Sequence, residues 1–113
     1  MFVGTYVFDN ICSANYSRTM KARLVQSDKV VFADGAIREV VIWLVPTPIP
    51  PGSHSFKYRM VYIVRGARVI GFDNERGKGD HMHLHGVETP YQFSGLAKLL
   101  ADFRGLVEKE RGE

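Results

Sequence analysis

The sequence predicts an α+β domain in which an antiparallel meander of about four to five strands packs against a C-terminal amphipathic helix. Three observations predict this class. Apolar or alternating runs of strand length fill the middle of the chain, turn dipeptides and glycines separate them, and helical spacing appears only near the C-terminal end. With 113 residues, 45% of them hydrophobic, the chain can form one domain with its own core.

The first well-patterned strand begins at Met20, and the residues before it form a separate region. Residues 1–19 have little periodicity, so we expect a flexible N-terminal arm or extension, with a single domain at residues 20–113. Either Met1 or Met20 is then the biological start. From Met20 hydrophobic residues alternate with basic ones as far as Leu24, which is typical of a half-buried strand.

Turn signals divide the next stretch. Asp28-Lys29 is expected to turn the chain into a short strand at Val30–Phe32, and Asp34-Gly35 is a strong turn dipeptide. Ile37–Val45 ends in a run that is apolar on both faces, which predicts a central strand. Four of the five prolines then lie within residues 46–51, which indicates an extended connection.

A hairpin and a helix are predicted for the rest of the chain. Phe56–Val64 alternates, a glycine-containing turn at residues 65–68 follows, and Val69–Phe72 is the return strand. We expect a turn at residues 88–91 and a helix N-cap at Ser94. The hydrophobic residues at helical spacing, which would cover the sheet, are Leu96, Leu99, Leu100, Phe103 and Val107.

Composition narrows the class of protein. No run approaches the ~18 apolar residues of a membrane span, and the first residues lack the basic region of a secretory signal. Cys12 is the only cysteine, so an internal disulfide is excluded. We therefore expect a cytoplasmic protein. The net charge of +3 and the pI near 9.2 favour a polyanionic partner weakly.

The chemically richest segment runs from Asp73 to His85, where eight of thirteen side chains can ionise. Because it follows the return strand, we expect a functional loop at a strand end. Metal-independent RNA cleavage is the leading hypothesis. Histidines suit the acid and base roles, Arg and Lys suit the phosphate, and a carboxylate can orient an imidazole. The candidate catalytic residues are Glu75, Arg76, Lys78, Asp80, His81 and His83.

A basic, tyrosine-bearing surface is expected beside this segment. The candidate nucleic-acid-binding residues are Lys57, Tyr58, Arg59 and Arg68, which suit phosphate contacts and base stacking. Between Lys57 and Lys78 there are six Lys or Arg residues and only two acidic residues. The alternative is that the tyrosine belongs to the core and that the arginines only solubilise a sheet edge.

Two further hypotheses remain open. In the first, His81, His83 and His85 bind zinc or another divalent metal and form a hydrolase site or a structural clip. Alternate residues of a strand lie about 6.6 Å apart, so neighbouring histidines can share an ion, but all three fit poorly on one straight strand. The candidates for a fourth ligand are Asp80, Glu88 and His54. In the second hypothesis the segment binds a protein or a nucleic acid without catalysis.

Several runs of the chain resemble the TumE family. The longest is Val69–His83, which contains Asp-Asn-Glu-Arg-Gly-Lys-Gly-Asp-His at residues 73–81. The shorter ones are Asp34-Gly35 with Val41–Trp43, Phe56–Arg59, Glu88–Phe93 and Leu99–Phe103. The resemblance covers residues from about Met20 to Val107. The N-terminal arm is extra, and His85 belongs to an unusually histidine-rich version of the segment after the motif.

The resemblance implies the toxin half of a type II toxin–antitoxin pair. That family would make the protein a cytoplasmic growth inhibitor neutralised by a cognate antitoxin, which often carries a helix-turn-helix. Ribonuclease activity is our inference from the residues of the charged segment. RNA is the expected target, and a homo-oligomer is compatible with the sequence.

Overall fold

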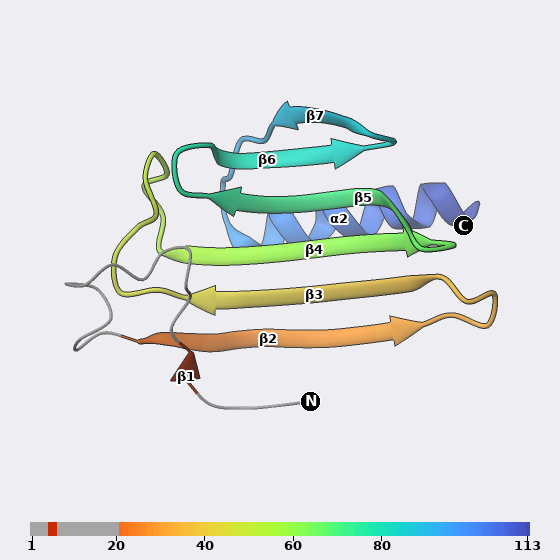
Figure 1. Ribbon diagram of the computed structural model, residues 1–113, viewed down its shortest axis with the longest axis horizontal. Coiled ribbons are helices and arrows are strands. Elements are labelled where there is room, and N and C mark those ends of the chain that lie inside the picture. The colour runs from red at the N-terminus through yellow and green to blue at the C-terminus, as the bar shows by residue number, and fades with distance from the viewer. Residues whose placement is uncertain (1–4, 7–20) are drawn as a thin grey trace.

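The computed structural model describes residues 5–6 and 21–113, which form a seven-stranded antiparallel meander with one helix behind it (Figure 1). Strand order in the sheet equals chain order. The elements are β1 (Thr5–Tyr6), β2 (Ala22–Val31), β3 (Ile37–Leu44), β4 (Phe56–Val64), β5 (Ala67–Glu75), β6 (Gly79–Leu84), β7 (Val87–Pro90) and α2 (Leu96–Arg111). The predicted α+β class is confirmed, with more strands than the four to five expected.

Several strands are longer than the sequence predicts. The Asp28-Lys29 turn is wrong, because both residues lie inside β2 and pair with Val40 and Glu39 of β3. The turn at residues 88–91 is also wrong, since Val87–Pro90 forms the edge strand β7, where a proline is tolerated. The charged segment is a hairpin and not a loop, because its two arms extend β5 and form β6.

Other local predictions have mixed outcomes. The chain does turn at Asp34-Gly35, and Gly35 has a φ of 89°, a conformation that glycine adopts readily. Ser94 as N-cap is wrong: α2 is capped at Gly95, and no side chain caps its first turn. Ser94 stands one residue too early to reach the free N–H groups of that turn.

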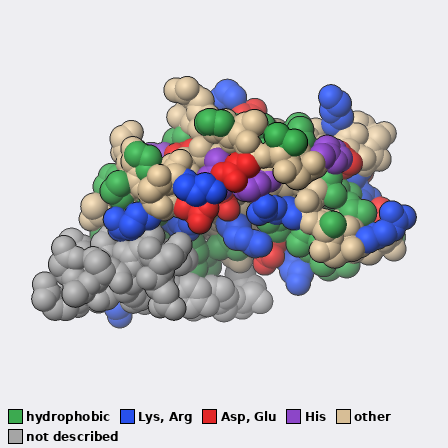
Figure 2. All heavy atoms as spheres, turned by 45° about the horizontal axis from the view of Figure 1, so that its top comes forward, with side chains coloured by type: hydrophobic (Ala, Val, Ile, Leu, Met, Phe, Trp, Pro, Cys, Tyr) green, Lys and Arg blue, Asp and Glu red, His purple; other side chains and the backbone are tan. Residues whose placement is uncertain are grey.

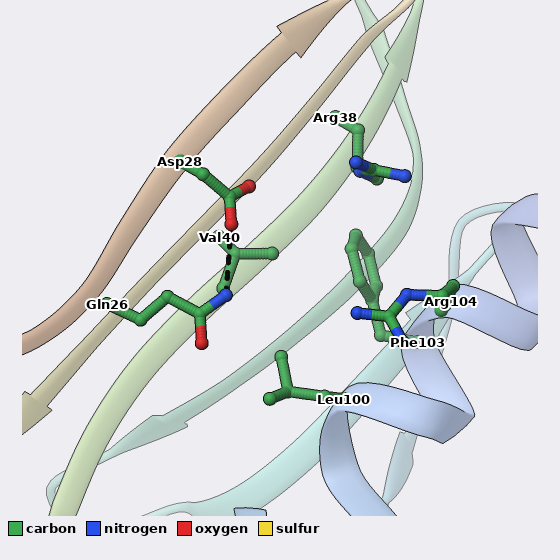
Figure 3. Close-up of a pocket in the computed structure, with 7 residues that line it drawn as sticks. All are labelled: Gln26, Asp28, Arg38, Val40, Leu100, Phe103 and Arg104. Atoms are coloured by element: carbon green, nitrogen blue, oxygen red, sulfur yellow. Dashed lines mark hydrogen bonds between the residues drawn. The ribbon is translucent and has the colours of Figure 1, made fainter. Parts of the chain in front are cut away.

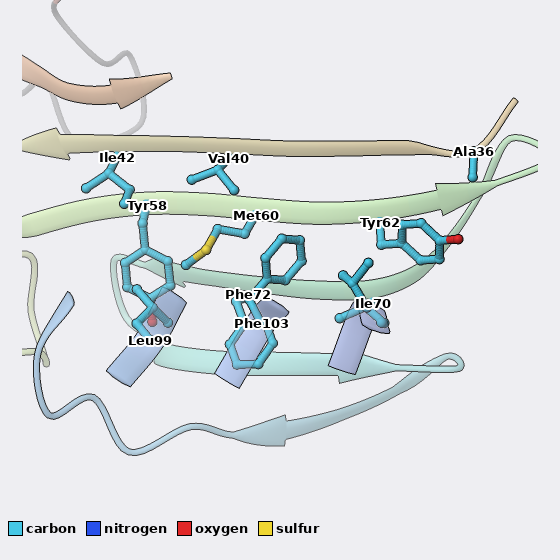
Figure 4. Packing of buried hydrophobic residues seen from close by; sticks show 11 residues of the cluster. Ala36, Val40, Ile42, Tyr58, Met60, Tyr62, Ile70, Phe72, Leu99 and Phe103 are labelled. Carbon is cyan, nitrogen blue, oxygen red and sulfur yellow. The ribbon is translucent and has the colours of Figure 1, made fainter. Parts of the chain in front are cut away.

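The hydrophobic stripe of α2 covers one side of the sheet, which we call the helix face (Figure 4). Leu99, Phe103 and Val107 are the buried residues of α2, in agreement with the predicted spacing. Their partners in the core come mainly from β3, β4 and β5: they include Val40, Ile42, Tyr58, Met60, Tyr62, Ile70 and Phe72. Each fully buried side chain of this size contributes about 1.5–3 kcal/mol, so α2 and the central strands form one cooperative core.

The predicted N-terminal arm, residues 1–19, lies outside the described residues apart from Thr5–Tyr6, which pair with β2. Its boundary with the domain therefore stays a prediction. Within the described part of the chain, no helix has the length and apolar character needed to cross a membrane.

Candidate functional site on the open face of the sheet

The register of β4 to β7 gathers charged side chains on the open face, the side of the sheet turned away from α2. Asp73 stands between Arg59 and His81, so these three side chains form one row across neighbouring strands. His83 and Glu88 face each other in the neighbouring row. Figure 2 shows acidic, basic and histidine side chains gathered there. The charged cluster, as we call it, comprises Lys57, Arg59, Arg68, Asp73, Glu75, Lys78, His81, His83 and Glu88.

His81 is the buried centre of the charged cluster, and only 4% of its side chain is exposed. Its Nδ1 lies 3.0 Å from the carbonyl oxygen of Gly79. Because a carbonyl only accepts, Nδ1 carries a proton and donates it there. The Nε2 atom contacts Asp73 Oδ1 and lies 3.6 Å from Glu75 Oε1 and 3.9 Å from Glu88 Oε2. Three carboxylates therefore surround one ring nitrogen.

The contact between His81 Nε2 and Asp73 Oδ1 is an ion pair when the ring is protonated, but no hydrogen bond joins the two atoms. Among the described residues, His81 Nε2 and Asp73 Oδ1 are buried side-chain atoms without a hydrogen-bond partner. Buried polar atoms are almost always paired, because an unpaired one costs about 1–3 kcal/mol. Such an exception within a charged cluster marks a candidate functional group.

His83 stands beside His81, with ring centroids 5.1 Å apart. Its Nε2 lies 4.0 Å from Glu88 Oε1. Burial, aided by the positive charge of Arg68, lowers the pKa of His83 below its ordinary value of 6.5. The imidazole is therefore mostly neutral at neutral pH. A neutral ring nitrogen is able to accept a proton or bind a metal ion.

Lys78 lies between two carboxylates of the charged cluster, those of Glu75 and Glu88. Its Nζ lies 2.7 Å from Glu88 Oε2 and 3.7 Å from Glu75 Oε1. The hydrogen bond from Lys78 lowers the pKa of Glu88, so this carboxylate stays charged at neutral pH. The cation thus holds Glu88 near the two histidines.

Three cations line the β4 and β5 side of the cluster. Lys57 donates to the carbonyl oxygen of Asn74, and its partial burial lowers its pKa. Arg59 is exposed opposite Asp73. The side chain of Arg68 crosses Gly71, where an added Cβ would lie 2.9 Å from Arg68 Cδ. A glycine is therefore needed at position 71 for this course of Arg68.

Two site predictions place residues on the wrong face. Tyr58 is fully buried in the core and cannot stack on a base, so the core alternative holds for it. Its hydroxyl donates to Asp80 Oδ2 at 2.6 Å, and burial and this carboxylate raise its pKa. Asp80 points to the helix face and so does not orient His81, because neighbouring residues in a strand face opposite sides.

The structure does not bring the three histidines of the metal hypothesis together. His85 lies in the turn after β6, and its Nε2 is 2.9 Å from Glu110 of α2, away from the cluster. Among the described residues, the group whose ligand atoms lie close enough to hold a metal ion is Asp73, His81 and His83. His54 and Asp80 contact each other on the helix face, so neither is the fourth ligand. Arg76 is exposed in the hairpin turn.

Sequence reasoning missed the role of Asp73. The sequence places Asp73 at the start of an expected loop, whereas in the structure it is a ladder partner of His81. The sequence does contain a signal for a hairpin here. Asp73 and Glu75 alternate before a glycine-containing turn, and His81 and His83 alternate after it. A hairpin with this register places the carboxylates beside the imidazoles.

The hollows on the helix face are separate from the charged cluster. The hollow in Figure 3 holds about 20 Å³, which is room for about one water molecule. A groove of about 430 Å³ lies on the β6 side of α2. Its lining residues are mostly apolar: Phe72, Met82, Tyr91, Ala101, Asp102, Gly105 and Leu106. Neither hollow contains a member of the charged cluster.

Comparison with known proteins identifies one family. The family model described as Toxin TumE matches residues 8–111, nearly the whole chain. Neither the curated proteins nor the solved structures contain a match to this chain.

Proposed function

The chain belongs to the TumE toxin family, and we propose that it cleaves RNA through the charged cluster on its open face. A toxin family implies an antitoxin as partner. The observation that supports a reactive site is the buried, unpaired contact between His81 and Asp73 beside the neutral His83. Perturbed and unpaired ionisable groups concentrate at functional sites.

The cations of the cluster support a phosphate-bearing substrate. Arg59 and Arg68 lie on the β4 and β5 side of the histidines, and both side chains are exposed. Arg binds phosphate oxygens with a planar fork, and Lys does so as a point charge. A polynucleotide that crosses this face would meet these cations first and the histidines next.

The cleavage reaction needs few groups. The 2′-oxygen forms a bond to the adjacent phosphorus while the bond from phosphorus to the 5′-oxygen breaks. In the metal-free route predicted from the sequence, His83 takes the 2′ proton as the base and His81 gives one to the leaving oxygen as the acid. The nearby cations stabilise the charge on the phosphorus centre.

A metal-assisted route uses the same residues and is the second candidate. The observation that favours it is the set of ligand atoms of Asp73, His81 and His83, which lie within 4.8 Å of one another. A metal ion would activate a nucleophile or polarise the phosphate. Sensitivity to a chelator distinguishes the two routes.

A toxin of this kind needs a cellular compartment in which to act and an antitoxin that inhibits it. A toxin that cleaves cellular RNA would act in the cytoplasm. There it would be the toxin of a type II system, and a cognate antitoxin would hold it inactive. Antitoxins of such systems often carry a helix-turn-helix.

The test uses purified protein and labelled RNA, with and without EDTA. Cleavage should be lost in His83→Ala and retained in His85→Ala, the matched control from the turn beyond β6. If the protein binds RNA without cleaving it, the proposal is contradicted and the hypothesis of a non-enzymatic binding module takes its place. Cleavage that persists in His83→Ala would contradict the placement of the site.

A further inference from the structure

We infer that Asp73, His81 and His83 bind one divalent transition-metal ion, for which zinc is the best match. This inference concerns binding and holds whether or not RNA is the substrate. It deepens the proposed function by assigning a ligand to the same cluster.

The first argument is the proton inventory of His81. Nδ1 donates to the carbonyl oxygen of Gly79, so neutral His81 has a lone pair on Nε2. That lone pair contacts Oδ1 of Asp73, which also carries lone pairs, and neither atom has a hydrogen-bond partner among the described residues. Two buried acceptors in contact repel each other unless a cation lies with them. The cation is either a proton on Nε2 or a metal ion.

The second argument is the convergence of a third ligand. One oxygen of Asp73 and one nitrogen each of His81 and His83 lie within 4.8 Å of one another. Zinc binds such atoms at about 2.0–2.2 Å, so ligand atoms around one ion lie roughly 3–4 Å apart. On binding an ion, His83, which has 16% of its side chain exposed, would move towards the other two ligands, and the contacting atoms of Asp73 and His81 would separate.

The third argument is the local excess of negative charge. Oxygens of Asp73, Glu75 and Glu88 all lie within 4.0 Å of His81 Nε2. Of these three carboxylates, Glu88 is the one that Lys78 contacts most closely. The three carboxylates attract a cation at Nε2, and a divalent ion would neutralise more of their charge than a single proton does.

The ligand types favour a transition metal such as zinc over magnesium or calcium. Two imidazoles and one carboxylate match catalytic zinc sites, which leave a fourth position for water or substrate. Magnesium and calcium prefer sites made of oxygen atoms. The bond from Nδ1 of His81 to Gly79 is the second-shell contact that holds a ligating imidazole in one tautomer.

The experiment measures metal binding directly. Protein stripped with EDTA and freed of chelator is titrated with zinc chloride in a calorimeter, and thermal unfolding is recorded with and without zinc. Wild type should bind one ion per chain and unfold at a higher temperature with zinc, because a ligand that binds only the native state stabilises it. Cobalt(II) in place of zinc should give the visible absorption of a tetrahedral site.

Variants assign the ligands. Asp73→Asn and His83→Ala should each weaken zinc binding by about tenfold or more, since even second-shell changes have effects of this size. His85→Ala should bind as wild type does, because His85 contacts Glu110 and not the cluster. Circular dichroism of the stripped proteins shows that the variants fold.

Three results would overturn the inference: no zinc binding by wild type, unchanged binding in both Asp73→Asn and His83→Ala, or loss of binding in His85→Ala. The proposed function fails separately. Stoichiometric zinc binding without RNA cleavage supports the metal site and contradicts the ribonuclease. Cleavage by protein that binds no zinc supports the ribonuclease and contradicts the metal site.

Discussion

Two histidine–carboxylate pairs lie on opposite faces of the same sheet, and they differ in how completely their atoms are bonded. On the helix face, His54 Nε2 lies 2.8 Å from Asp80 Oδ2, and its Nδ1 accepts from the N–H of Phe56 at 3.1 Å. On the open face, His81 contacts Asp73, but two of their buried atoms have no partner among the described residues.

The surroundings of the two pairs explain the difference. The ring of His54 stacks on Phe93 at 3.8 Å, and Asp80 also accepts from the hydroxyl of Tyr58. Those bonds hold the core together and leave nothing for a ligand. Around His81 there are carboxylates and a second imidazole in place of aromatic rings. A satisfied pair is a structural feature, and an unsatisfied pair at a charged surface is a candidate site.

The largest expected effect is on activity at the open face. His83→Ala should reduce RNA cleavage by about 100-fold or more, the usual contribution of a general acid or base. Its unfolding free energy should fall by only about 1 kcal/mol, because the side chain is partly buried but lies outside the hydrophobic core. Labelled-RNA cleavage and urea unfolding measure the two quantities. A large loss of stability would show that His83 has a structural role, and the open face would then no longer differ from the helix face in this respect.

The largest expected effect on stability is at the helix face. Asp80→Ala leaves the hydroxyl of Tyr58 and the ring of His54 without their shared acceptor. Each unsatisfied group costs about 1–3 kcal/mol, so the free energy of unfolding should fall by several kcal/mol. The matched change on the open face, Asp73→Ala, should cost much less. If both variants lost the same free energy of unfolding in urea, the two pairs would contribute equally to stability and the contrast would be contradicted.

A smaller change tests a single bond of the satisfied pair. Tyr58→Phe keeps the ring in the core and removes only the O–H that donates to Asp80. The unfolding free energy should fall by about 1–3 kcal/mol, because this hydrogen bond has a charged acceptor. RNA cleavage should not change. A variant that folds normally but has lost activity would instead connect Tyr58 to the site.

The smallest effect concerns the cations. Gly71→Ala places a Cβ against the side chain of Arg68 and should displace it from beside His83 without changing any charge. RNA affinity should fall severalfold, with a weaker dependence on salt. Gly105→Ala is the control, since a Cβ there meets nothing within 4 Å. Equal affinity of the two variants in a binding titration would exclude Arg68 from the interface.

Local periodicity was enough to predict the core elements. β4 occupies the predicted Phe56–Val64, and Leu99, Phe103 and Val107 are buried as their helical spacing indicates. These patterns depend on neighbours within a few residues, which the sequence shows directly. The same local reading failed at Asp28-Lys29, because the ladder with β3 continues through a polar pair that by itself favours a turn.

For the site, the sequence by itself determined the ingredients: two histidines at alternate positions, flanked by Lys, Arg and carboxylates. Only the tertiary structure decided which of them meet. Register across β5 and β6 brings Asp73 to His81, and strand alternation sends Asp80 to the helix face, where it meets His54 from 26 residues away. Such pairings depend on which strands align, and that is determined by the packing of the whole sheet rather than by any one segment.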